Sequence, residues 1–250
     1  MRTLGVDLAA ATKKTAVAVL EWGQDSVRLV HLALDVDDHE IVELFDFADM
    51  TGIDCPVGWP RALIPFLTGH LNFDAGPVLA YDGIEGRRLL AYRDTDRFVT
   101  ARTGLIPLSV SADRLAHPAM RCAVIQARIA ALHGAQPRDG SGRLAEVYPA
   151  ASLKIWGLKA RSYKGRGKSE TESLSLLLGN LRRQAPWLDL GGHEDRLSGS
   201  DDLFDAVVAS LTARAVAVGL TIVPDDAHAA AALSEGWIHL PAGRLTELAC

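Results

Sequence analysis

Three short runs rich in valine and leucine open the chain, and they constrain its fold more than any other feature. Residues 3–8 (TLGVDL), 15–21 (TAVAVLE) and 26–32 (SVRLVHL) are separated by connections of only a few residues. Connections this short join neighbouring antiparallel strands, because a parallel pair needs a crossover of about a dozen residues or more. The sequence therefore predicts a sheet that begins with three consecutive antiparallel strands.

Helices and strands then alternate. The sequence predicts helices over 37–48, 61–69, 118–134, 150–157, 168–184 and 199–220, strands over 50–56 and 143–149, and a short helix with a strand-like tail over 224–241. This order indicates a mixed α/β sheet and not a doubly wound parallel one. Residues 69–110 are hard to assign, although PVLAYDG at 77–83 is strand-like. We expect one domain over 1–250, with an irregular insertion around 69–115.

Composition excludes several classes of protein. The 250 residues are 48% hydrophobic and 23% charged, which is typical of a folded globular chain. No apolar run approaches the roughly 18 residues that span a bilayer, and the N-terminal residues lack the apolar stretch of a signal peptide. We therefore expect a cytoplasmic protein with no membrane partner. Three scattered cysteines and the absence of a clustered histidine pair argue against a disulfide framework or a zinc site.

One basic segment stands out in a chain whose net charge is −5. Residues 158–168 (LKARSYKGRGK) carry five cations, and four side chains of this segment are candidates for contacts with phosphates or bases: Tyr163, Lys164, Arg166 and Lys168. The alternative is a solvated surface loop without a ligand, and the sequence leaves both interpretations open.

Two carboxylates occupy unusual positions in predicted strands. Asp7 lies inside the first strand, where a buried carboxylate is costly unless it is paired or bound to a metal. Asp54 lies at the carboxyl end of the fourth strand, where ligands collect in α/β sheets. If the first and fourth strands are adjacent and parallel, these two side chains meet. A divalent cation or a shared proton relieves the repulsion between such carboxylates.

Further acidic candidates lie elsewhere in the chain. Asp205, one turn inside the helix predicted at 199–220, is flanked by Phe204 and Ala206 and is expected to lean over the same sheet edge. Asp202 is a weaker candidate, because acidic residues in a first helical turn are common. Glu146 is a further one, although a strand glutamate before an aromatic residue is more often a surface or salt-bridging residue. A set of oxygen ligands without histidine or cysteine favours Mg²⁺ or Mn²⁺.

Several motifs, taken in order, resemble one known family. GVD, GIDCPVGWP, YRDTD, EVYPAASLKIWG, SYKG, DLFDAVVASLTARA and EGWIHLP together are similar to the bacterial and archaeal family catalogued as domain of unknown function 429. The resemblance covers nearly the whole chain. It implies an RNase H-like fold and a nuclease activity, with a catalytic cluster at Asp7, Asp54 and Asp205 and with Glu146 and Asp202 as less certain members.

The ligand set then predicts a mechanism. Two Mg²⁺ ions roughly 4 Å apart would flank a scissile phosphate of DNA or RNA, with Asp7 bridging them and Asp54 and Asp205 each holding one. Arg93 and Asp96, in YRDTDRF, are candidates for the same cleft, and the alternative is a helix cap by Thr95 or Asp96 with Arg93 on the surface.

Two other functions fit the same pattern. An ATP-dependent phosphotransferase of the actin and sugar-kinase type shares the strand order and the first-strand aspartate, but the turn DLAAATKKT lacks the glycines that cradle phosphates in such folds. A non-catalytic binding or scaffold protein is the second alternative. Its only support is the acidic net charge and the single basic segment.

Overall fold

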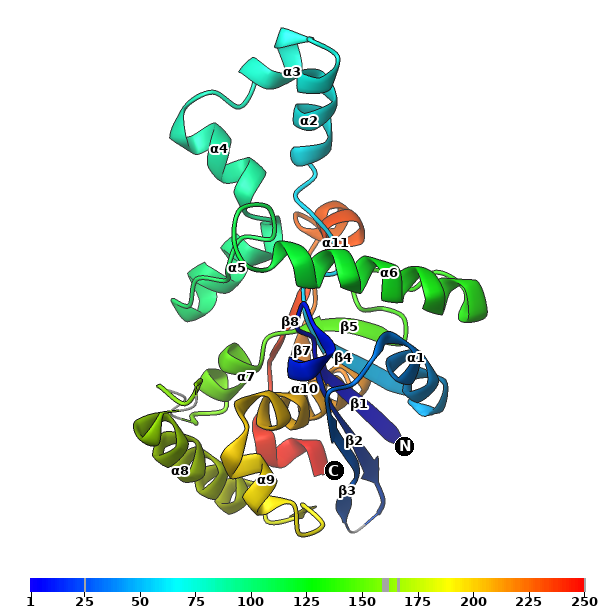
Figure 1. Ribbon diagram of the computed structural model, residues 1–250, viewed down its shortest axis with the longest axis vertical. Coiled ribbons are helices and arrows are strands. Elements are labelled where there is room, and N and C mark those ends of the chain that lie inside the picture. The colour runs from blue at the N-terminus through cyan, green and yellow to red at the C-terminus, as the bar shows by residue number, and fades with distance from the viewer. Residues whose placement is uncertain (25, 159–161, 166, 250) are drawn as a thin grey trace.

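The computed structural model describes every residue except 25, 159–161, 166 and 250 (Figure 1). Within the described residues the strands are β1 Arg2–Asp7, β2 Ala16–Trp22, β3 Val27–Leu34, β4 Met50–Asp54, β5 Leu144–Val147, β6 Leu188–Asp189, β7 Thr221–Ile222 and β8 Ile238–Pro241. The helices are α1 Asp38–Phe47, α2 Leu63–Leu71, α3 Ala75–Leu79, α4 Gly83–Ala91, α5 Asp94–Thr103, α6 Ala116–His133, α7 Pro149–Ile155, α8 Lys168–Gln184, α9 Glu194–Gly199, α10 Asp201–Ala217 and α11 Ala229–Glu235. Two short 3₁₀ helices, η1 Thr12–Lys14 and η2 Leu245–Ala249, complete this part of the chain.

These strands form one mixed sheet in the order β6-β3-β2-β1-β4-β5-β8-β7. β1, β2 and β3 pair antiparallel, as the short connections predict. β4 lies parallel to β1, and β5 and β8 continue the parallel half of the sheet. The predicted mixed α/β class is therefore confirmed, and so is the neighbourhood of the first and fourth strands. No helix in the described part of the chain combines the length and the apolar character that a bilayer crossing requires.

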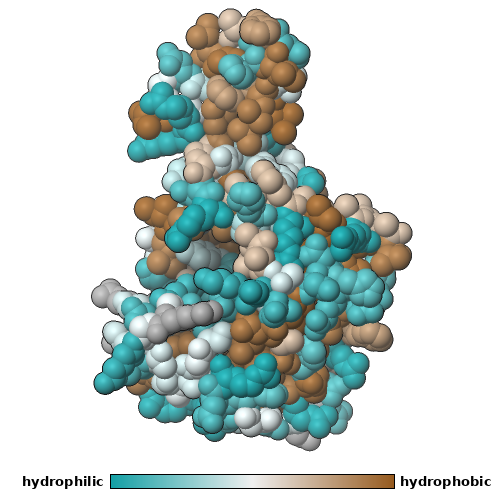
Figure 2. Space-filling view, in the orientation of Figure 1, coloured by the Kyte–Doolittle hydropathy of each residue, from teal (hydrophilic) through white to brown (hydrophobic). Residues whose placement is uncertain are grey.

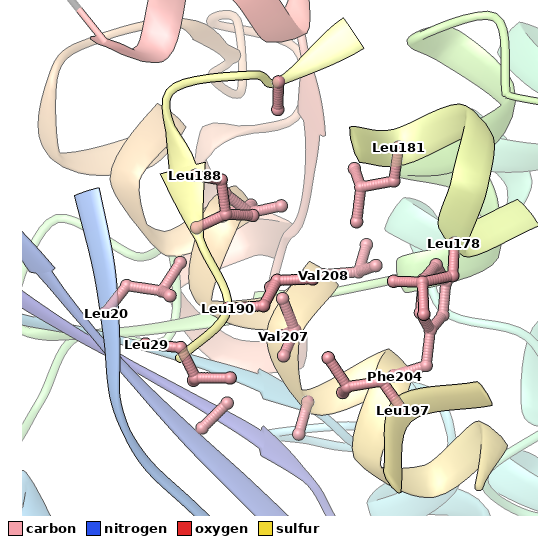
Figure 3. Close-up of a cluster of buried hydrophobic side chains, with 14 of the residues drawn as sticks. Leu20, Leu29, Leu178, Leu181, Leu188, Leu190, Leu197, Phe204, Val207 and Val208 are labelled. Atoms are coloured by element: carbon pink, nitrogen blue, oxygen red, sulfur yellow. The ribbon is translucent and has the colours of Figure 1, made fainter. Parts of the chain in front are cut away.

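Helices cover both faces of the sheet. On one face α1 and α6 pack over alternate side chains of β1 and β4, among them Leu4, Val6 and Ile53. On the other face α8, α9 and α10 pack over β2 and β3 (Figure 3). In that second cluster Phe204, Val207 and Val208 of α10 face the leucines of α8 and of the segment around β6. The leucines of α8 recur at helical spacing, and four of them are buried there: Leu174, Leu177, Leu178 and Leu181.

The central helix α10 lies unusually close to the sheet, because two glycines face it. A Cβ atom at Gly5 would overlap the carbonyl oxygen of Ala206, and one at Gly52 would lie 2.6 Å from the carbonyl oxygen of Ala209. Gly5 and Gly52 are direct partners across the β1–β4 pair. The backbone of α10 therefore rests on two adjacent strands where they present no side chain to it.

A small polar network fixes α10 along β1. The Ser210 hydroxyl donates to the Thr3 carbonyl oxygen at 2.9 Å and lies 2.8 Å from the Thr3 hydroxyl. The indole N–H of Trp22 donates to the same Thr3 hydroxyl at 2.9 Å. All of these groups are buried, so a shift of the helix along the strand would leave polar atoms without partners.

The segment between β4 and α6 differs from its prediction. PVLAYDG was expected to be strand-like, but residues 75–79 form α3, which begins where the Asp74 side chain accepts from Gly76 N–H. Pro77 is tolerated because the first turn of a helix needs no N–H donor there. α2, α3 and α4 form a helical arm that projects away from the sheet (Figure 1), and much of its surface is apolar (Figure 2), with Phe73 and Leu71 largely exposed.

Substitution of Gly5 tests the close approach of α10. Gly5→Ala forces the helix away from β1, and we expect the free energy of unfolding to fall by about 3 kcal/mol. Gly179→Ala is the matched control, since a Cβ atom there meets nothing within 4 Å on the exposed face of α8. We expect that control to be neutral or up to about 1 kcal/mol more stable. Urea unfolding of both variants gives the comparison, and equal stabilities would contradict the packing described here.

Candidate acidic active site

Three carboxylates from distant parts of the chain converge at one sheet edge. Asp7 and Asp54 end β1 and β4, where they are direct partners in the parallel register. Asp7 lies two residues after Gly5, and Asp54 lies two residues after Gly52. Because side chains alternate along a strand, both carboxylates lie on the face of the sheet that α10 covers. Asp205 lies on α10 one residue before Ala206, whose carbonyl oxygen rests over Gly5. The close helix–sheet contact therefore carries Asp205 to the ends of both strands.

The carboxylates open onto a cleft of about 480 Å³. Its polar lining comes from the ends of β1, β4 and β5, from Arg93 at the start of α5 and from the segment that follows α7, and its remaining wall is largely apolar. Pro107, Leu108, Leu115 and Ile238 are among the apolar residues. A cleft of this size accommodates a group as large as a nucleotide.

Lys164 and Tyr163 hold Asp205 in place. The Lys164 ammonium lies 2.6 Å from Asp205 Oδ2, and the Tyr163 hydroxyl donates to Asp205 Oδ1 at 2.8 Å. The Tyr163 ring is buried against Phe204, with ring centroids 6.1 Å apart. Tyr163 thus packs in the core and orients a carboxylate, instead of offering an exposed stacking surface to a base.

The acidic residues titrate abnormally because they are buried together. Burial raises the pKa of Asp54 to about 7, with a further increase from Asp205 and Glu146 and an opposing effect from Lys164. Burial also raises the pKa of Asp7 well above its ordinary value, and the charges of Asp205 and Asp54 add to this shift. Burial lowers the pKa of Lys164, but the carboxylate of Asp205 and its neighbours outweigh that effect and raise it.

Arg93 and Glu146 form a separate buried ion pair beside this cluster. The Arg93 guanidinium donates to both carboxylate oxygens of Glu146 at 2.7 Å, and its other N–H groups donate to Asp96 and to the Glu235 carbonyl oxygen. Val57 N–H donates to Glu146 as well. All five N–H groups of Arg93 are therefore used within the protein, which leaves none for a substrate phosphate. Glu146 lines the cleft but is already fully engaged.

Arg93 is buried, so the expected alternative of a surface position is wrong, although the cap at Asp96 is present. The Asp96 carboxylate accepts from the Arg93 backbone N–H at the start of α5, which is a capping-box contact. Thr95 has a different role, since its hydroxyl accepts from Ile238 N–H of β8.

The remaining predicted site residues lie at the margin or outside the described part. Asp202 is half-buried in the first turn of α10, where burial and the charge of Asp201 raise its pKa. Lys168 is exposed at the first residue of α8 and does not line the cleft. Arg166 lies outside the described residues.

Sequence reasoning missed Tyr148. It follows β5 directly and lines the cleft, and burial together with the charge of Asp54 raises the pKa of its hydroxyl. The signal that could have found it is the one that identified Asp54, namely a polar side chain at the carboxyl end of a parallel strand.

The donor set fits a divalent cation in chemistry and charge. Asp7, Asp54 and Asp205 offer only oxygen atoms, the ligands that Mg²⁺ and Mn²⁺ prefer. Together with Lys164 they leave an excess of two negative charges when all are ionised. The described residues include no group of three or more His, Cys, Asp or Glu side chains placed to hold a metal ion, and Lys164 already contacts Asp205. Asp7 and Asp54 are therefore the residues that would hold a cation.

The raised pKa of Asp54 predicts how stability changes with pH. The folded protein holds a proton on Asp54 between about pH 4 and pH 7 that the unfolded chain has already lost, so stability falls as pH rises through about 7. The difference between 3.8 and about 7 corresponds to roughly 4 kcal/mol at most. In metal-free buffer, Asp54→Asn is expected to be more stable than the wild type at pH 8, with a much smaller difference at pH 5.

Thermal melts across this pH range provide the measurement. Asp226→Asn, at an exposed position remote from the cleft, is the control and should follow the wild-type curve. If the stability of the wild type and that of Asp54→Asn changed with pH in parallel, the result would contradict a raised pKa of the buried Asp54.

Comparisons with known proteins identify one family. The family described as "Protein of unknown function (DUF429)" matches residues 5–229, which is most of the chain, and this confirms the resemblance expected from the sequence motifs. Neither a curated protein nor a solved structure gives a significant match.

Proposed function

The chain belongs to the DUF429 family, whose description assigns no activity, and from its site we propose that it is a divalent-cation-dependent phosphodiesterase that acts on nucleic acid. The observation that carries the proposal is the convergence of Asp7, Asp54 and Asp205 at the carboxyl ends of β1 and β4. Their shared burial is costly for a protein unless positive charge is added to the site.

The sheet supports an RNase H-like assignment. Its central order β3-β2-β1-β4-β5, with β2 antiparallel and β4 and β5 parallel to β1, agrees with the order that the family resemblance implies. We propose on this basis that the fold is RNase H-like, enlarged by the helical arm and by the elements that follow β5. The predicted cytoplasmic location is part of the same proposal.

The roles of the residues follow from their contacts. Asp7 and Asp54 would hold the cation, which when bound would supply an activated water and neutralise charge on the phosphodiester. Tyr163 and Lys164 keep Asp205 oriented toward the strand ends. Lys164 uses one of its three N–H groups on Asp205, so its others are available to phosphate oxygens. The Arg93–Glu146 pair supports the floor of the cleft beside Asp54.

The cleft also limits the kind of substrate. Its described cations, Lys164 and Arg93, are both paired with carboxylates, so it does not offer the row of free cations that tracks a long phosphate backbone. Its apolar wall suits a base or a sugar instead. We propose a flexible single strand or a strand end as the substrate, with one nucleotide seated in the cleft.

The two alternatives from the sequence gain no specific support. The connection between β1 and β2 contains η1 and no glycine, so the phosphate cradle of the kinase type is not evident in it. A non-catalytic scaffold is the outcome that a complete absence of turnover would favour.

Incubation with labelled single-stranded, duplex, hybrid and branched substrates in Mn²⁺ tests the proposal. We expect the wild type to cleave at least one of them, and Asp54→Asn to cleave it about 100-fold more slowly or worse, since it removes a ligand. Asp226→Asn is the control for charge and should retain activity. Equal cleavage by the wild type and Asp54→Asn, or no cleavage of any substrate, would contradict the proposed function.

A further inference from the structure

Lys164 occupies an unusual place for a residue of a basic loop. Half of its side chain is exposed (51%), yet its ammonium group lies against Asp205, whose side chain is only 1% exposed. The same ammonium also attracts Asp54 and Asp7. Lys164 therefore reaches from the mouth of the cleft into the carboxylate cluster.

The surrounding loop is built to hold the lysine there. Tyr163, directly before it, donates to Asp205, and Gly165, directly after it, donates from its backbone N–H to Asp201 at 3.1 Å. Ser162 has a left-handed backbone with φ of 54°, which is uncommon for a residue other than glycine. Tyr163, Lys164 and Gly165 thus all contact acidic side chains in the first two turns of α10.

The charges of the cluster balance with a single divalent ion. Asp7, Asp54 and Asp205 carry three negative charges when ionised, and Lys164 carries one positive charge, which leaves two. Glu146 belongs to a separate network, in which Arg93 binds both Glu146 and Asp96, and that network carries one further negative charge when all three groups are ionised. Asp202 is half-buried at the margin, where Lys14 also opposes its charge. One divalent cation neutralises the remaining charge of Asp7, Asp54, Asp205 and Lys164.

Asp205 is also poorly placed to accept a metal ion. Each of its oxygens already takes a hydrogen bond, one from Tyr163 and one from Lys164. A metal ion on Asp205 would have to displace a charge-assisted contact of 2.6 Å. Within the described part of the chain, no lysine or arginine forms an ion pair with Asp7 or Asp54 as Lys164 does with Asp205.

We propose that Lys164 is a built-in cation that takes the place of a second metal ion, so that the site binds one divalent ion, on Asp7 and Asp54, instead of the two expected from the sequence. This inference rests on the proposed function. Lys164 then supplies the positive charge on the Asp205 side of the cleft, where it can contact a phosphate oxygen.

Counting bound Mn²⁺ tests the inference without any substrate. Metal-free protein at pH 8 is titrated with Mn²⁺, and the free ion is measured by its electron paramagnetic resonance signal. We expect one bound ion in the wild type and in Lys164→Arg, which keeps a cation. Lys164→Met removes the cation and opens Asp205, so we expect two bound ions. Arg87→Met, an equal change of charge on exposed α4, should bind one.

Each other outcome contradicts the inference. Two ions in the wild type would show that Lys164 gives way to metal, and one ion with unchanged affinity in Lys164→Met would show that the lysine does not occupy a cation position. If Lys164→Met does not unfold cooperatively, Lys164→Gln takes its place. If the wild type bound two ions and its hydrolysis depended on Asp54, this inference would be overturned and the proposed function would stand. No bound Mn²⁺ together with no hydrolysis would overturn the proposed function too.

Discussion

The close contact of α10 with β1 and β4 is the constraint on which the rest of the structure depends. It exists because Gly5 and Gly52 face each other in the register and leave room for the helix backbone. Buried hydrogen bonds among Thr3, Ser210 and Trp22 then fix the position of α10 along β1. Asp205 reaches the strand ends only in this arrangement, so packing of small residues in the core determines the geometry of the polar site.

The electrostatics of the site follow from that packing. Carboxylates that are buried together repel, and without a bound cation the protein relieves the repulsion with protons and with Lys164. Beside them Arg93 binds the carboxylates of both Glu146 and Asp96 within a buried hydrogen-bonded network. The cluster is thus divided into a paired half and a half with unbalanced negative charge. The unbalanced half, at Asp7 and Asp54, is where a cation or a proton is needed.

Much of the framework could be predicted from the sequence, because it is encoded locally. Runs rich in valine and leucine and short connections identified the first strands, and helical spacing identified α8 and α10. Asp7 was predicted inside the first strand and Asp54 at the end of the fourth, and the expected neighbourhood of these strands brought the two residues together. Asp7 is in fact the last residue of β1. The strand-like PVLAYDG was wrong because a run of Val, Leu and Ala fits either structure, and the cap at Asp74 decides it.

The partners of the charged residues could not be predicted, because they depend on tertiary contacts. Nothing in SYKG shows that Tyr163 binds a carboxylate 42 residues later, and a basic segment normally indicates a solvated surface. Arg93 and Glu146 are 53 residues apart, and only the fold reveals that they form a buried ion pair. The two short strands β6 and β7 were missed because two-residue strands have no detectable period.

A crystal structure of the protein grown with Mn²⁺, with anomalous diffraction data, tests the central claim most directly. The account predicts a single anomalous peak between the carboxylates of Asp7 and Asp54, with the Lys164 nitrogen still on Asp205. Carboxylates that point to separate regions of the molecule, or manganese bound away from all of them, would contradict it.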